Sequence, residues 1–349
     1  MSYPAVADLP LEVDSYELDR LERPVSGEFT RVTTVVRLRG RGEEGLGEDV
    51  TYDADDHDAQ QQAGSFLPLA GRHTLDGFSS LLAELDLFPS PPQRDVYRLY
   101  RRWAFESAAL DLALRQSRLS FADAVGRRPR PVTFVVSLRL GEPPTADPVL
   151  RRLELYPSLR FKLDPTSSWT DELVAELHAT GAVDSFDFKG RYTGTIVDQP
   201  PDSELYERVV RVFPDAWFED PALTEETDTV LAPYRDRITW DEPIHSVADI
   251  EALPFPPRMV NVKPSRFGSL RALLETYAYC EERGIGIYGG GQFELGPGRG
   301  QNQYLASVFH PDTPNDVAPT GFHDQQPRPG LPVSPLEPAI APTGFRWLA

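Results

Sequence analysis

Short apolar runs recur through the second part of this chain, and several of them end on a charged residue. From residue 131 onward they read VTFVVSL, SLRFK, VDSFD, AWFE, ITWD, MVNVK and IGIYG, with starts roughly 20 to 33 residues apart. Between them lie amphipathic stretches such as TDELVAELHATG and SLRALLETYAYCEERG. Strands that alternate with helices at this period form parallel sheets. Seven such units and a less regular eighth predict a (β/α)8 barrel of the TIM type rather than an open doubly wound sheet.

The first third of the chain has a different pattern. VTTVVRLR at 32–39 predicts a strand, and GRGEEGLGED after it predicts a glycine-rich turn. Residues 90–118 carry apolar side chains at helical spacing. We therefore expect an N-terminal α+β capping domain over residues 1–128 and the barrel over 129–315. The proline-rich residues 316–349 are expected to form a strap that packs back on barrel and cap.

Composition limits the partners and the setting. The formal net charge of −19 argues against nucleic acid and anionic membranes, because both would repel the chain. A single cysteine, Cys280, allows no intrachain disulfide and fits a reducing compartment. The N-terminus shows no signal-peptide pattern, and no stretch approaches the roughly 18 apolar residues of a membrane span. We expect an acidic cytoplasmic protein, with a homo-oligomer left open.

Lysine is rare in this chain, with 3 lysines among 35 basic residues. They are Lys162, Lys189 and Lys263, and each stands at or just past the end of an apolar run. Arginine cannot release its proton inside a protein, whereas a lysine can be tuned to act as a base. The three lysines are therefore candidates for positions where the charge must be removable. The alternative is that codon bias left them by chance.

Charged residues stand at the carboxyl ends of five consecutive predicted strands. In chain order they are Lys162, Asp187, Glu219, Asp241 and Lys263. In a barrel these ends converge on one site. Three carboxylates brought together repel one another unless they share protons or a cation, and hard carboxylate oxygens suit Mg²⁺. With a lysine on either side, such a site can remove a proton next to a carboxylate while the metal holds the resulting enediolate.

These positions and their neighbours resemble the enolase superfamily, in its muconate-cycloisomerase-like branch. The matching segments are Arg160-Phe161-Lys162 for the K-x-K motif, Asp187, Glu219 and Asp241-Glu242 for the metal ligands, Lys263 for the second lysine, and residues 105–113 for the helix before the barrel. The resemblance covers most of the chain. It implies a cap over the barrel mouth, Mg²⁺ held by the three acids, and catalysis by Lys162 and Lys263.

Four further residues are candidates for binding the substrate or supporting the site: Arg160, Lys189, Glu242 and Glu294. Arg160 replaces the first lysine of K-x-K and is expected to hold substrate and depress the pKa of Lys162 by like-charge proximity. Lys189 stands where the family usually has asparagine, and would bind a substrate anion, replace the charge of the metal, or lie in a surface loop. Glu294 follows Gly289-Gly290-Gly291 and lies either near the substrate or in a solvated turn.

The sequence thus predicts a Mg²⁺-dependent enzyme that abstracts a proton α to the carboxylate of a small-molecule substrate. The resemblance implies cycloisomerisation, o-succinylbenzoate synthesis by dehydration, or epimerisation, and the residues do not choose among them. The alternative is a non-catalytic barrel of the same ancestry, a binding or scaffold protein whose metal site has lapsed. Arg160 and Lys189 are the residues that keep this alternative open.

Overall fold

Parallel strands form most of a closed ring in the second part of the chain. The computed structural model describes residues 3–25, 29–192 and 198–348. Within them five strands pair in the order β6-β7-β8-β9-β10, and β11 pairs with β12. Their bounds are Val136–Leu138 (β6), Phe161–Leu163 (β7), Val183–Asp187 (β8), Trp217–Glu219 (β9), Ile238–Thr239 (β10), Met259–Val262 (β11) and Gly286–Gly289 (β12).

Two irregular links close the ring. A parallel bridge between Trp240 and Val260 joins β10 to β11. The segment at Asn315 and Asp316 takes the place of an eighth strand. The backbone N–H of Asp316 donates to the last carbonyl of β12, and Asn315 bridges to Phe134 just before β6. The predicted (β/α)8 barrel is therefore confirmed, with its less regular eighth unit lying across the expected boundary between residues 315 and 316.

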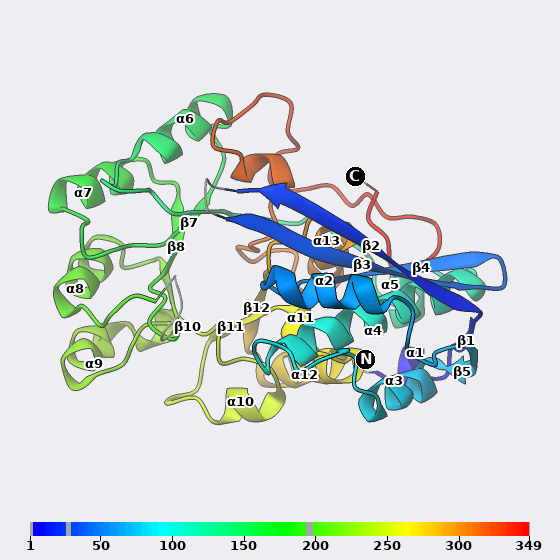
Figure 1. Cartoon of the computed structure of the whole chain (residues 1–349). Coiled ribbons are helices and arrows are strands. Elements are labelled where there is room, and N and C mark those ends of the chain that lie inside the picture. Colours follow the sequence, from blue (N-terminus) through cyan, green and yellow to red (C-terminus); the bar gives the residue numbers. More distant parts are fainter. Residues whose placement is uncertain (1–2, 26–28, 193–197, 349) are drawn as a thin grey trace.

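Helices carry the chain from the end of each strand back to the start of the next. Figure 1 shows α6 to α9 outside the strands at the left of the barrel. Threonine, aspartate or serine side chains cap α7, α8, α9, α10 and α12 by accepting a backbone N–H. The bounds are Asp147–Leu155 (α6), Asp171–Ala179 (α7), Ser203–Val212 (α8), Glu225–Leu231 (α9), Val247–Glu251 (α10), Pro264–Phe267 (α11), Leu270–Arg283 (α12) and Pro297–Phe309 (α13).

The N-terminal residues build a second layer beside the barrel, drawn in blue and cyan in Figure 1. An antiparallel sheet β2-β3-β4 packs on the long helix α4, and a smaller pair, β1-β5, lies at its edge. The bounds are Pro4–Ala7 (α1), Pro10–Val13 (β1), Ser15–Pro24 (β2), Thr30–Gly40 (β3), Glu43–Asp49 (β4), Ala54–Ala63 (α2), Gly71–Thr74 (β5), Leu75–Glu84 (α3), Tyr97–Gln116 (α4) and Phe121–Val125 (α5). The helix predicted within residues 90–118 is confirmed as α4.

The glycine-rich turn predicted at 40–49 is wrong, because most of that segment is strand β4. Its glycines serve close packing. A Cβ at Gly47 would lie 1.9 Å from the carbonyl oxygen of Ala104, and one at Gly45 would lie 2.1 Å from that of Ala108. Because α4 lies directly against the strand backbone there, only glycine fits at these two positions.

Buried carboxylates tie the first layer to the barrel and to the tail. Glu48 on β4 accepts the backbone N–H groups of Leu295, Gly296 and Gly298 at the start of α13. Asp111 on α4 accepts the backbone N–H of Phe345, and its other oxygen binds the guanidinium of Arg346. These bonds fix α13, which follows β12, and the chain end against the first layer.

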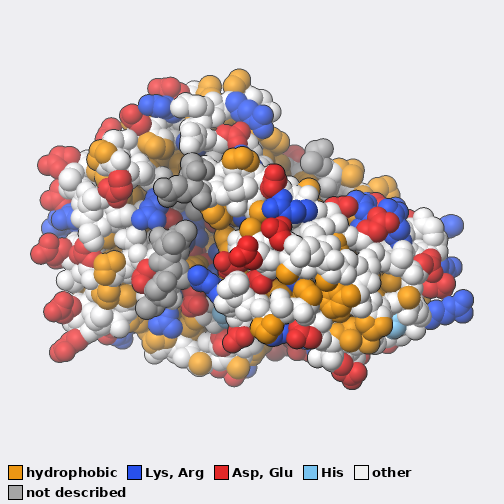
Figure 2. All heavy atoms as spheres, viewed as in Figure 1, with side chains coloured by type: hydrophobic (Ala, Val, Ile, Leu, Met, Phe, Trp, Pro, Cys, Tyr) orange, Lys and Arg blue, Asp and Glu red, His pale blue; other side chains and the backbone are white. Residues whose placement is uncertain are grey.

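Acidic side chains project along the outer barrel helices at the left of Figure 2, and basic ones are interspersed with acidic ones over the rest of that face. The excess negative charge is therefore spread over the visible surface. Among the described ranges, no helix has the length and apolar character needed to cross a membrane.

Gly47→Ala should lower the free energy of unfolding by about 1–3 kcal/mol or more, because the added methyl group overlaps the α4 backbone. Denaturant unfolding followed by circular dichroism measures the change. Gly77→Ala in α3 is the matched control, since its new Cβ would meet only the Thr74 hydroxyl at 3.2 Å. Equal stability of wild type and Gly47→Ala would contradict the close packing of β4 on α4.

Candidate active site

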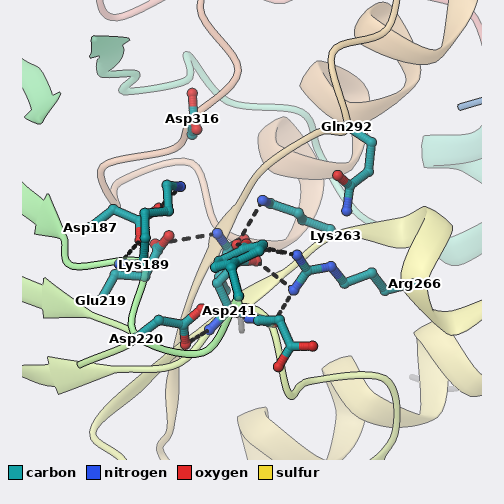
Figure 3. A network of polar contacts seen from close by, with 12 residues as sticks. Asp187, Lys189, Glu219, Asp220, Asp241, Lys263, Arg266, Gln292 and Asp316 are labelled. Atoms are coloured by element: carbon teal, nitrogen blue, oxygen red, sulfur yellow. Dashed lines mark hydrogen bonds and ion pairs between the residues drawn. The ribbon is translucent and has the colours of Figure 1, made fainter. Parts of the chain in front are cut away.

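Three buried carboxylates meet at the carboxyl ends of neighbouring strands. Asp187 ends β8, Glu219 ends β9, and Asp241 follows β10 by two residues. All three side chains are fully buried, and one oxygen from each lies within 4.8 Å of the others. Figure 3 shows them turned toward one another. The structure thus brings together the three acids that strand-end position predicted as metal ligands.

Each acid is paired with a lysine. Lys162 from β7 donates to Glu219 Oε1, and its Nζ lies 3.3 Å from Asp187 Oδ2. Lys263, directly after β11, donates to Asp241 Oδ2 over 2.7 Å. Lys189 donates to Asp187 Oδ2. All three lysines of the chain therefore contact this one cluster of acids.

The pKa values of the three acids split in opposite directions. Burial alone would raise each pKa. Lys189 and Lys162 outweigh burial at Asp187 and lower its pKa, and Arg266 and Lys263 do the same at Asp241. At Glu219, burial and the charges of Asp187 and Asp241 prevail over Lys162, and the pKa stands well above its usual range. The charged form of Glu219 is therefore disfavoured in this cluster, although several cationic side chains contact the three acids.

The expected effect of Arg160 on Lys162 is wrong. Burial favours a low pKa for Lys162, but the charges of Glu219 and Asp187 raise it well above the usual value. The Arg160 side chain turns away from the cluster, with its Nε 2.9 Å from Asp184 Oδ1 and 40% of the side chain exposed. Arg160 precedes β7 by one residue, and its partner Asp184 is the extra residue of β8 where the register with β7 shifts between Phe161 and Lys162.

Glu242 and Glu294 remain candidates for contacts with a substrate, and the structure gives the contacts that they make within the protein. The backbone N–H of Glu242 donates to Asp220 Oδ2 over 2.8 Å. The carboxylate of Glu294 is buried and turns back on its own loop, where Oε1 accepts the N–H of Gln292 and the amide of Asn302. The glycines before it have another use. A Cβ at Gly290 would lie 2.8 Å from Lys263 Cε, so this glycine makes room for the stem of that lysine.

Several residues of the site were not predicted. Arg266 on α11 lies one helical turn after Lys263, and its Nη1 is 3.1 Å from Asp241 Oδ1. The Tyr288 hydroxyl on β12 donates to Glu219 Oε2, and the Tyr192 hydroxyl donates to Asp241 Oδ2 over 2.8 Å. Asp316, in the segment that takes the place of the eighth strand, has its Oδ2 3.8 Å from Lys162 Nζ. The i, i+3 spacing of Lys263 and Arg266 was the one available signal, because the others depend on closure of the ring.

Asp220 was also missed, and it fixes one of the three acids in place. Its carboxylate accepts the backbone N–H groups of Asp241 and Glu242, at 2.9 and 2.8 Å. Asp220 itself has a left-handed backbone, with φ 47°, directly after the strand-end Glu219. Burial, with the charges of Asp241 and Asp187, raises its pKa to about 7. Asp220 therefore orients the turn that carries Asp241.

The donor set fits a hard divalent cation. Three carboxylates converge, and the buried oxygens Asp241 Oδ1 and Asn261 Oδ1 accept no hydrogen bond from the described residues. Oxygen ligands of this kind suit Mg²⁺ and leave room for water or a bidentate substrate. The arrangement can thus hold a cation on one side of a bound carboxylate and present lysine amines from two directions.

The solved structures that this chain resembles include members of the enolase superfamily. A member of unknown function from Enterococcus faecalis matches with a TM-score of 0.66 and 21% identity, covering 88% of this chain and 86% of that one. A dipeptide epimerase from Methylococcus capsulatus, solved with a Mg ion, matches with a TM-score of 0.63 and 19% identity over 91% and 89%. Muconate cycloisomerases match as well. The resemblance inferred from the strand-end motifs is confirmed, and the chain has the fold of this superfamily.

Within that fold, the chain belongs to the family described as domain of unknown function (DUF8230). Its N-terminal domain matches residues 4–124 and its C-terminal domain residues 128–324. An N-succinylamino acid racemase from Thermus thermophilus is 25% identical over 340 residues, covering 88% of this chain and 86% of the relative. An o-succinylbenzoate synthase from Enterococcus faecalis is 26% identical over 227 residues, or 62% and 59%. These relatives are named as enzymes.

Asp220→Ala should destabilise the protein by about 1–3 kcal/mol or more, because two buried N–H groups lose their acceptor. Denaturant unfolding measures the loss. Asp215→Ala, at an exposed position after α8, is the control and should be close to neutral. Equal stability of both variants would show that Asp220 does not hold the Asp241 turn.

Proposed function

We propose that this protein is a Mg²⁺-dependent enzyme that removes a proton α to a carboxylate of a small-molecule substrate. The observation that carries the proposal is the convergence of Asp187, Glu219 and Asp241 between two lysines from opposite sides of the cluster. The named activities of its relatives, a racemase, a synthase and an epimerase, support the class of reaction. They do not select one substrate for this chain.

In this proposal Asp187, Glu219 and Asp241 hold the metal. Bound there, Mg²⁺ would neutralise the negative charge that develops on the substrate carboxylate as the α proton leaves. The three acids are fully buried, so that charge would interact strongly in a site with little water.

The protein's own proton-transfer groups are the two lysines that flank the acids. Lys263 sits at the end of β11, where Gly290 leaves space for its stem and Asp241 fixes its amine. As the free amine it takes the α proton at Nζ and becomes the ammonium. Lys162 approaches from β7 on the other side, where it serves as acid, as second base in an epimerisation, or as a fixed positive charge beside the enolate.

The same proposal assigns the parts of the chain. Residues 1–128 form the cap, 129–315 the barrel, and 316–349 a strap that holds the two together. This division is supported by the bonds of Glu48 to the start of α13 and of Asp111 to Phe345 and Arg346. The substrate would bind between the strand ends and the cap, as a small carboxylate with neither nucleic acid nor membrane as partner.

Mg²⁺ should bind to the wild-type protein, and Glu219→Gln should weaken or abolish that binding, because an amide replaces a charged ligand. Isothermal titration calorimetry measures both. Glu225→Gln, an exposed acid on α9, is the matched control and should bind Mg²⁺ like the wild type. Unchanged binding in Glu219→Gln would remove Glu219 from the metal site. Wild-type protein without Mg²⁺ binding would favour the non-catalytic barrel.

Lys263→Arg should abolish proton transfer while leaving Mg²⁺ binding intact, because guanidinium keeps the charge but cannot release its proton. The assay is incorporation of deuterium at the α carbon of N-acyl amino acids, dipeptides and hydroxy acids in D₂O, read by mass spectrometry. Arg283→Lys, at the half-exposed end of α12, is the control and should exchange like the wild type. Full exchange by Lys263→Arg would eliminate Lys263 as the base. If the wild-type protein holds Mg²⁺ but exchanges the α proton of none of these compounds, the result would argue for a binding role.

A further inference from the structure

The ammonium of Lys189 lies between two carboxylates on neighbouring strands. It contacts Oδ2 of Asp187 at the end of β8, and it is 4.0 Å from Oδ2 of Asp164, which follows β7. The backbone of Lys189 is held in place, because its N–H donates to Asp187 Oδ1 over 3.2 Å and its φ of 55° is left-handed. The long side chain of Lys189 can reach the carboxylate of either Asp187 or Asp164.

Asp164 is a partly buried carboxylate, with 19% of its side chain exposed. Its Oδ1 is enclosed and accepts no hydrogen bond within the described part of the chain. The Lys189 ammonium, at 4.0 Å from Oδ2, stands beyond hydrogen-bond distance. A buried charged group that lacks its partner is costly. The carboxylate of Asp164 is therefore a second acceptor close to Lys189 that the ammonium does not bond.

Asp187 shows the opposite imbalance. Its Oδ2 receives the ammonium groups of both Lys162 and Lys189. Lys162 is 2% exposed and is also bonded to Glu219, so it is held where it is. Lys189, with 16% of its side chain exposed, is the one with a second acceptor nearby. A divalent cation approaching Asp187 would therefore meet the positive charge of Lys189 beside this carboxylate.

We propose that Asp164 is a positioning residue that draws the Lys189 ammonium away from Asp187 and thereby sets the affinity of the triad for a divalent cation. The inference rests on the proposed metal site. The ammonium moves by about 1 Å to reach hydrogen-bond distance of Asp164. It leaves one carboxylate for another, so neither a bare ammonium nor an unpaired Asp164 is created. In this role Lys189 does not replace the charge of the metal, and it does not bind the substrate.

A double-mutant cycle on Mg²⁺ affinity tests this role with the full-length protein. Isothermal titration calorimetry compares the wild type, Asp164→Asn, Lys189→Met and the double variant. Asp164→Asn should bind Mg²⁺ roughly tenfold more weakly, because Lys189 then stays on Asp187. Lys189→Met should bind at least as tightly as the wild type. In the Lys189→Met background, Asp164→Asn should have no further effect.

Controls separate this role from a general loss of charge or of fold. Asp184→Asn removes an acid from the same strand β8, where Asp184 pairs with Arg160 away from the triad, and should leave the affinity unchanged. If Asp164→Asn does not fold, as judged by thermal unfolding, Asp164→Ser replaces it. An equal loss of affinity from Asp164→Asn with and without Lys189 would overturn the proposal in favour of a long-range charge effect, as would no loss at all. Wild-type protein that binds no Mg²⁺ would overturn the metal site itself and this role with it.

Discussion

Repulsion among three buried carboxylates is the constraint around which this site is built. Asp187, Glu219 and Asp241 are all fully enclosed, and burial penalises each negative charge. Four cationic side chains form ion pairs with these acids, namely Lys162, Lys189, Lys263 and Arg266. Burial, together with the charges of Asp187 and Asp241, still raises the pKa of Glu219 well above its usual range. In the proposed function, a divalent cation bound by the three acids would offset this repulsion.

The scaffold holds the acids close by means of strand ends and backbone contacts. The last residues of β8 and β9 supply two of them, and the turn after β10 supplies the third, tied down by Asp220. Gly290 admits the stem of Lys263, and Glu48 fixes the loop and helix that follow. Positions with little side-chain freedom thus surround the groups that must act. This arrangement keeps the functional atoms in place without depending on the surface loops.

The sequence predicted those parts of the molecule that depend on local periodicity. Strand and helix alternation located the barrel and its strand ends, and hence the triad, because consecutive parallel strands bring their ends together. The orientation of Arg160 depends on a non-local partner, Asp184 on β8, which the sequence pattern does not indicate. Asp316 and Tyr288 reach the site only because the segment at Asn315 and Asp316 closes the ring of strands. The prediction of a turn at residues 40–49 fails because the glycines of β4, which are typical of turns, are required there by the helix packed on the strand.

The scarcity of lysine takes on a more specific meaning in the structure. All three lysines contact the acid cluster, but they do not share one reason for being lysine. Lys162 lies between Glu219 and Asp187, where a compact ammonium fits two acceptors and a planar guanidinium would demand more space. Lys189 needs a flexible stem to serve either of two carboxylates. Lys263 is the lysine proposed as the base, and its stem lies beside Asp241 in a gap left by Gly290. Arg266, bonded to the same acid, supplies the permanent charge there, and the division of labour between the two residues follows from their chemistry.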